Sequence, residues 1–231
     1  EVRQQIDSLD QQIQDLITQR ANWAQMVREA KGDLKAAVEY YRPERESQIL
    51  RRVLDRNEGP LSNEVLLRLF REIMSACLAQ QEPLKVGYLG PEGTFSQQAL
   101  HKHFGHSAQS LPLASIEEVF QEIEDGHADF GVVPVENSGQ GTIQSTLDMF
   151  LTSKLKICGE VELRVHQHLL SRTGRMEDIE RVYSHPQSLA QCKAWLRQHL
   201  PHAEKIPVSS NAEAARRARV AQLVEHRFCK P

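Results

Sequence analysis

The chain has 231 residues, of which 40% are hydrophobic and 26% charged, a composition typical of a globular protein with one large or two small domains. Its 28 Lys and Arg residues against 31 Asp and Glu residues give a formal net charge of -3, and no block of basic residues stands out. This balance argues against a nucleic-acid-binding protein and is compatible with small anionic ligands.

The cysteines are widely spaced, contain no CxxC pair and follow no secretory segment; they are Cys77, Cys158, Cys192 and Cys229. This pattern predicts free thiols in a reducing compartment, and therefore a cytoplasmic protein. No run approaches the ~18 uninterrupted apolar residues of a membrane-spanning helix. The chain begins at Glu1 rather than at a methionine, which indicates a processed chain or a fragment.

Residues 1–82 contain few helix breakers and are predicted to be entirely helical. We expect a first helix of ~30 residues, because apolar residues recur at alternating spacings of four and three. A second helix is expected from Pro43 to a stop at Gly59, and a third over 62–81. The seam of the first helix consists of Val2, Ile6, Leu9, Ile13, Leu16, Trp23, Val27 and Ala30. Three helices of such unequal length cannot bury this seam alone, which predicts a partner chain.

After Pro83 the pattern changes to alternating strands and helices, which predicts an α/β sheet. A capping box at Ser115-Ile-Glu-Glu118 should open one of the helices. The expected strands are 86–89, 130–133, a pair within 157–168, 182–183 and 206–208, and the expected helices begin at 95, 116, 143, 188 and 211. The predicted fold class is therefore an all-helical segment followed by an α/β segment.

The seam places Arg20 where Leu or Ile belongs, and an unpaired guanidinium there would cost several kcal/mol. Lys31 lies about 20° from the same helix face and ~16 Å along the axis, so the two cations could clamp a small dianion. Arg3 lies ~42 Å of straight helix from Lys31 and could join such a site only from another subunit. The alternative is that Arg20 pairs with an internal carboxylate or extends its head to water.

Arg3, Arg20, Lys31, the Arg45-Glu46 pair and Gln81 stand in the order and spacing of the bacterial all-helical chorismate mutases, which residues 1–82 resemble. The resemblance implies an intertwined homodimer through the first helix and a pericyclic rearrangement of chorismate to prephenate without a cofactor.

By this resemblance, Arg3 of the partner chain and Arg20 hold the substrate carboxylates. Lys31 and Gln81 would bond the ether oxygen, and Glu46, with Arg45 nearby, would take the ring hydroxyl. The chain departs from the family pattern at two further substrate-binding candidates, Arg42 and Cys77, which replace Asp and Ser of some relatives.

In the second segment, Gly90-Pro-Glu-Gly93 and Thr94 join a strand to a helix and offer free backbone N–H groups to an anion, although a plain turn would have the same sequence. Glu136 and Asn137 follow a buried strand, at the edge where open sheets bind ligands. Tyr183-Ser-His-Pro-Gln is a further strand end leading into a helix.

Together these stretches resemble the prephenate dehydratase family, so the whole pattern resembles the bifunctional chorismate mutase/prephenate dehydratases. The resemblance implies a two-lobed fold like that of periplasmic binding proteins, in which prephenate loses carbon dioxide and hydroxide in the cleft. Asn137, Ser184 and Gln191 would line that cleft, with Thr94, Glu136 and His185 as neighbours. No metal or cofactor is implied.

The remaining histidines favour no metal site. His101 and His103 point about 200° apart on a helix, which is typical of a solvated helix end. His166 and His168 share a strand face but lack a third ligand nearby.

We assign residues 1–82 to a mutase domain, 84–219 to an incomplete dehydratase domain and 220–231 to an atypical tail. Relatives continue with a Thr-Arg-Phe motif, whose threonine is the expected proton donor, and with a regulatory ACT domain that binds phenylalanine. We therefore expect this chain to retain mutase activity and to have little or no dehydratase activity. The alternative function is a non-catalytic dimeric module that binds a small carboxylate.

Overall fold

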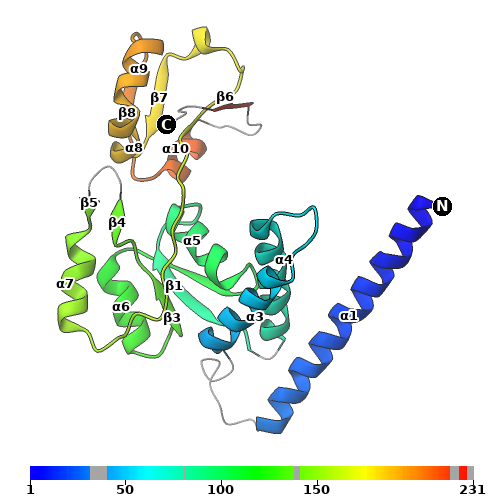
Figure 1. Ribbon diagram of the computed structural model, residues 1–231. Helices are drawn as coiled ribbons and strands as arrows, with labels where there is room; N and C mark the ends of the chain where they lie inside the picture. Colours follow the sequence, from blue (N-terminus) through cyan, green and yellow to red (C-terminus); the bar gives the residue numbers. More distant parts are fainter. Residues whose placement is uncertain (32–40, 81, 138–140, 219–223, 228–231) are drawn as a thin grey trace.

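The computed structural model describes residues 1–31, 41–80, 82–137, 141–218 and 224–227, without the side chains of 28–31 and 224–227. It contains a helical segment, a lower α/β lobe and an upper α/β lobe (Figure 1). No helix in these residues combines the length and apolar character that crossing a membrane requires.

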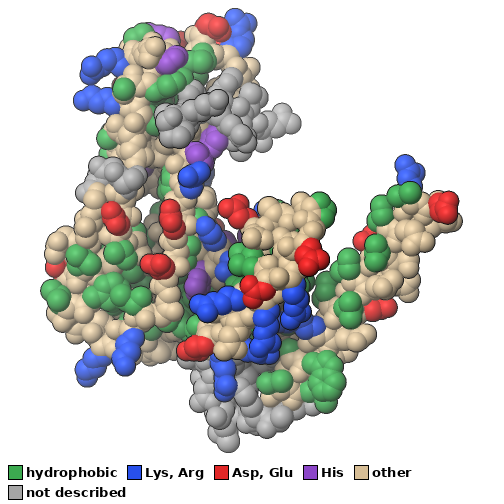
Figure 2. All heavy atoms as spheres, viewed as in Figure 1, with side chains coloured by type: hydrophobic (Ala, Val, Ile, Leu, Met, Phe, Trp, Pro, Cys, Tyr) green, Lys and Arg blue, Asp and Glu red, His purple; other side chains and the backbone are tan. Residues whose placement is uncertain are grey.

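The helical segment begins with α1 (Val2–Lys31), whose 30 residues confirm the predicted long helix. α1 projects from the rest of the molecule, and its N-terminal end lies far from α3 (Pro43–Asp55) and α4 (Asn63–Ala79) (Figure 1). Its seam is uncovered: Val2 is 76% exposed and Trp23 is 66% exposed. Figure 2 shows these hydrophobic side chains along the projecting helix.

Pro43 occupies the first turn of α3, as predicted, but the predicted stop at Gly59 was wrong. α3 ends at Asp55, with Arg56 as the C-cap, and Asn57 then closes the turn by donating from Nδ2 to the Leu61 carbonyl. The Asn57 side chain thus bonds the backbone of the turn in which we expected Gly59 to end the helix, accepting from the Gly59 amide and donating to the Leu61 carbonyl.

The lower lobe is built on a parallel sheet of order β2-β1-β3, with β1 (Lys85–Leu89) in the centre. The other elements are β2 (Gln109–Leu113), β3 (Phe130–Val132), β4 (Glu136–Asn137), β5 (Gly141–Thr142), α5 (Phe95–Phe104), α6 (Ile116–Glu124) and α7 (Gln144–Thr152). The predicted capping box at α6 is confirmed: Ser115 accepts from the Glu118 amide at 3.1 Å, and the Glu118 carboxylate accepts from the Ala114 amide at 2.9 Å.

The core of this lobe includes a side chain from the helical segment. Val86, Tyr88 and Leu100 are fully buried, and Tyr41, which precedes α3, packs in the same cluster. Its ring centroid lies 5.6 Å from that of Phe104 and 5.3 Å from that of Phe130. The helical segment and the lower lobe therefore share one hydrophobic core.

The upper lobe pairs β7 with β8 in parallel and packs them against the helices α8 and α9 around Val182, Leu196 and Leu200. Its elements are β6 (His168–Ser171), the 3-10 turn Met176–Asp178, β7 (Arg181–Ser184), α8 (Pro186–Gln191), α9 (Lys193–His199), β8 (Glu204–Pro207), α10 (Asn211–Arg217) and β9 (Val224–Arg227). β9 pairs with β6 in antiparallel register. The helix predicted over 188–199 starts earlier, because His185 caps it ahead of Pro186, and is interrupted at Cys192.

The predicted pair of strands within 157–168 was wrong. Only β6, from His168, is a strand, and 153–167 is an extended connection from the lower lobe to the upper one (Figure 1). The Lys102 ammonium donates to the Glu162 carbonyl of this connection at 2.7 Å. Apolar and polar residues alternate along this segment as in a strand because it lies across α5. The Lys102 side chain, rather than a neighbouring strand, satisfies the Glu162 carbonyl.

Candidate functional site

Among the described residues, the side chains predicted for the helical site are spread over α1, α3 and α4. Arg3 is exposed near the free end of α1, and Arg20 is half-buried on the same helix. Lys31 ends α1, but its side chain lies outside the described residues, as does all of Gln81. Arg42 and Arg45 are exposed at the start of α3, whereas Cys77 is buried in α4.

Glu46, one of the residues predicted for the helical site, is mostly buried and forms an ion pair with Arg71. Its Oε1 lies 3.4 Å from Nε of Arg71, and the two side chains are 17% and 23% exposed. Burial raises the pKa of Glu46, while Arg71 and a hydrogen bond with Tyr41 act in the opposite direction. Neither Arg71 nor Tyr41 was predicted as a site residue, because their role appears only when the helical segment docks on the lower lobe.

The predicted site residues of the α/β segment gather where strands end. β1 runs into the glycine turn and Thr94, β3 is followed by β4 with Glu136 and Asn137, and β7 ends at Ser184. Ligands in open α/β sheets bind at the carboxyl ends of such strands. The prediction that these side chains follow strand ends is therefore consistent with the topology.

Asn137 and Gln191, 54 positions apart in the chain, meet between the lobes. Gln191 donates from Nε2 to Oδ1 of Asn137 at 3.4 Å, and its own Oε1 accepts from Nε2 of Gln167 at 3.1 Å. The three side chains come from the lower lobe, the upper lobe and the connection between them. The contact therefore lies at the junction of the lobes, and it includes Gln167, which the sequence analysis did not select.

A second polar group centres on Asn211, which the sequence analysis also missed. Its Oδ1 accepts from the Ser184 hydroxyl at 2.7 Å and from the His185 amide at 3.0 Å, and its Nδ2 donates to the buried Ser188 hydroxyl at 3.0 Å. Asn211 thus fixes the end of β7 to the start of α8. The signal in the sequence was the Ser209-Ser-Asn211 run at the start of the helix predicted from 211.

The glycine turn brings the lower lobe to the same place. Gly93 has a φ of +82°, and a Cβ on it would lie 3.1 Å from Cβ of Ala212, next to Asn211. Thr94 caps α5 and donates from its hydroxyl to the Leu89 carbonyl at 3.3 Å. A hollow of about 840 Å³ lies mainly in the upper lobe, where Ser184 and Asn211 line it, and Phe95 is its lining residue from the lower lobe.

Two further candidates differ in their surroundings. Glu136 is exposed and pairs in β4 with Thr142 of β5. His185 is half-buried, and its Nδ1 accepts from the Gln187 amide at 3.3 Å. The described residues contain no group of three or more side chains suited to holding a metal ion.

Comparison with known proteins identifies both segments. Residues 86–226 match the family model for prephenate dehydratase, and residues 2–82 match that for chorismate mutase type II. The bifunctional chorismate mutase/prephenate dehydratase of Stutzerimonas stutzeri is 55% identical over 94% of this chain and 61% of its own length. That of Pseudomonas aeruginosa is 54% identical with the same coverage.

A solved structure agrees with these matches. The prephenate dehydratase of Staphylococcus aureus has a TM-score of 0.51 and 29% identity, over 58% of this chain and 51% of its own. The chain spans 61% of the length of the two curated relatives named above. The chain belongs to the prephenate dehydratase family, and its residues 2–82, ahead of the dehydratase match, match the chorismate mutase type II model.

Proposed function

We propose that this protein acts in phenylalanine biosynthesis, rearranging chorismate to prephenate in its helical segment and binding prephenate between its α/β lobes. The observation that carries this proposal is the match of one chain to both family models in this order. The curated relatives named above support it, since both are named as enzymes with the two activities. We assign 1–82 to the mutase domain, 84–219 to the dehydratase domain and 220–231 to the tail.

The mutase site is proposed to form in a homodimer. The seam of α1 is exposed in the single chain, and an apolar seam of this length is stabilised by pairing with a second helix. Pairing would bring Arg3 of one chain towards Arg20 and Lys31 of the other. Free thiols at Cys77 and Cys158 support the cytoplasm as the location.

Catalysis in this site is proposed to rest on positioning and charge, because the rearrangement needs neither a nucleophile nor a proton transfer. Arg3 and Arg20 would fix the two carboxylates, and Lys31 and Gln81 would stabilise the ether oxygen as its bond breaks. Glu46 would accept a hydrogen bond from the ring hydroxyl, with Arg45, Arg42 and Cys77 close to the substrate. Stabilisation of charge that develops only in the transition state raises kcat rather than binding alone.

For the second site, we propose that Asn137, Ser184 and Gln191 contact prephenate, with Thr94, Glu136 and His185 beside them. Their support is the contact between Asn137 and Gln191 and the Asn211 cluster that holds Ser184. In dehydration, the ring loses carbon dioxide and hydroxide and becomes aromatic. The amide and hydroxyl groups at the junction can orient the substrate for this step but cannot replace an acid.

The two halves can be tested with separate readouts on the full chain. With chorismate, the expected result is prephenate formation by the wild type and its loss in Lys31→Ala at unchanged helicity. With prephenate, equilibrium dialysis in the Lys31→Ala background, in which the helical site is disabled, should show binding that Ser184→Ala weakens. Binding of either compound without turnover of chorismate would favour the non-catalytic binding module instead.

A further inference from the structure

We propose that Arg71 is a positioning residue for Glu46 and that the lower α/β lobe, rather than the helical segment alone, sets the geometry of this part of the mutase site. The inference rests on the mutase function proposed above. It concerns two side chains, Arg71 and Tyr41, to which no role in either reaction has been assigned.

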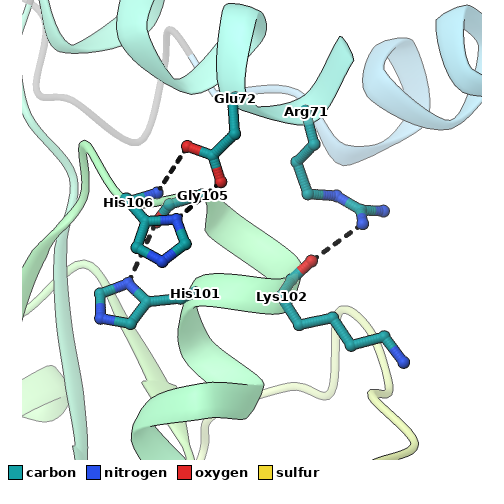
Figure 3. A network of polar contacts seen from close by, with 6 residues as sticks. All are labelled: Arg71, Glu72, His101, Lys102, Gly105 and His106. Atoms are coloured by element: carbon teal, nitrogen blue, oxygen red, sulfur yellow. Dashed lines mark hydrogen bonds and ion pairs between the residues drawn. The ribbon is translucent and has the colours of Figure 1, made fainter. Parts of the chain in front are cut away.

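Arg71 joins the helical segment to the lower lobe. It lies on α4, and its Nη1 donates to the carbonyl of Lys102, in the last turn of α5, at 2.8 Å (Figure 3). Through Nε, 3.4 Å from Oε1, the same guanidinium contacts Glu46. A guanidinium presents several donors in a fixed planar arrangement, so the Lys102 carbonyl fixes the orientation in which Nε meets the carboxylate.

Tyr41 holds Glu46 in a similar way. Its hydroxyl hydrogen-bonds with the Glu46 carboxylate, and its ring packs against Phe104 and Phe130 in the core of the lower lobe. The Tyr41 ring is thus anchored in the lower lobe, and Arg71, which belongs to α4, is oriented by a carbonyl of that lobe. A shift of this lobe against α3 and α4 would move the Tyr41 ring and the Lys102 carbonyl together.

The contact between α4 and α5 is close enough to transmit such a shift. The Glu72 carboxylate accepts from the His106 amide at 3.1 Å and lies 2.7 Å from Nδ1 of the same residue (Figure 3). Gly105 has a φ of +79°, and a Cβ on it would lie 2.5 Å from Cβ of Ser75. There is no room between the two helices for a side chain at this position.

The charges around Glu46 give a measurable signature. Burial raises the pKa of Glu46, whereas the positive charge of Arg71 acts to lower it. The pKa of Tyr41 is raised, first by burial and then by the charges of Glu46 and Cys158. His103 of α5 lies in the same region, and burial followed by the charge of Arg71 lowers its pKa. Arg71 is therefore the cation that opposes the effect of burial on Glu46, whose pKa stays above its usual value.

The experiment is the pH profile of kcat/KM for chorismate rearrangement by the full chain. If ionised Glu46 accepts from the substrate hydroxyl, kcat/KM falls as the pH drops through the pKa of Glu46. In Arg71→Ala this acid limb should move to higher pH by about one unit, because an opposite charge at this distance lowers a carboxyl pKa by at least that much. Arg71→Lys should give an intermediate shift, since lysine keeps the charge without the fixed fork.

Two controls separate positioning from general loosening of the interface. Glu72→Ala removes the neighbouring contact on the same helix without touching Glu46, and should leave the limb in place and kcat/KM within about twofold. In a Glu46→Gln background, Arg71→Ala should no longer shift the profile, because coupled residues are not additive. If Arg71→Ala does not fold, Arg71→Lys and Tyr41→Phe provide the same comparison.

The outcomes distinguish this inference from the proposed function. An unmoved limb in the Arg71 variants, or an equal shift in Glu72→Ala, would overturn the positioning role while the mutase assignment stands. If the wild type does not convert chorismate, the proposed function fails and this inference fails with it, whereas normal conversion by Lys31→Ala would overturn only the role given to Lys31.

Discussion

The substitution Gly105→Ala tests how tightly the helical segment is docked on the lower lobe. Gly105 has φ and ψ of 79° and 176°, a region that is almost restricted to glycine and costs other residues about 1–3 kcal/mol. The new Cβ would also lie 2.5 Å from Cβ and 2.6 Å from Oγ of Ser75, so α4 and α5 must separate. Overpacking of this kind costs roughly 1–3 kcal/mol. The expected total is therefore about 2–6 kcal/mol.

Hydrogen exchange of the α4 and α5 amides measures this change as a lower free energy of local opening. Gly126→Ala is the matched control, because Gly126 also has a positive φ, of +75°, but nothing within 4 Å of the new Cβ. In a Ser75→Gly background, the steric part of the Gly105→Ala effect should disappear. An equal effect of Gly105→Ala in the two backgrounds would refute the argument that the helices are in direct contact.

Three further predictions concern the core, the junction and the docking contact. Leu100→Ala should lower the free energy of unfolding in urea by about 2–5 kcal/mol, because Leu100 is fully buried. Leu151→Ala, at an 84% exposed position, should change it by less than about 0.5 kcal/mol. Similar losses in the two variants would contradict the assigned core. Asn211→Ala should cost about 1–3 kcal/mol in the same assay, because it leaves the buried Ser188 hydroxyl without its donor, and no loss would contradict the cluster. Burial acts to raise the pKa of Glu72, but its hydrogen bonds with His106 outweigh burial, so the pKa is lowered. The contact therefore contributes its full stabilisation above the pKa of the unfolded state, and this stabilisation is lost as the pH falls through the lower pKa of the folded state. The free energy of local opening of α5, obtained from exchange rates corrected for the intrinsic pH dependence, should therefore fall in acid in the wild type, and Glu72→Ala should remove that part of the pH dependence.

Local patterns predicted most of the elements. The heptad spacing of α1, Pro43 at the start of α3 and the Ser115 capping box each act over a few residues, and the structure has all three. The two failures have different causes. Asn57 closes the turn after α3 through a local side-chain hydrogen bond that we did not consider, whereas Lys102, 60 positions away from Glu162, holds an extended connection at the place where we expected paired strands.

The candidate site likewise contains residues that local sequence patterns predict and residues that they do not. Residues that follow strand ends, such as Asn137 and Ser184, could be selected because chain direction alone places them at the edge of a sheet. Asn211 and Gln167 act only by contact with residues far away in the sequence, and no periodicity marks them. Tyr41 stood beside a helix start in the sequence, and only the docked structure places its ring in the core of the other segment.

The most direct test of the proposed function is to give the purified chain chorismate and to follow prephenate before any acid treatment. The account predicts that prephenate accumulates, and that it does so only at the uncatalysed rate when Lys31 is replaced by alanine. Loss of chorismate at the uncatalysed rate with the wild-type chain would contradict the central claim that the helical segment is a chorismate mutase.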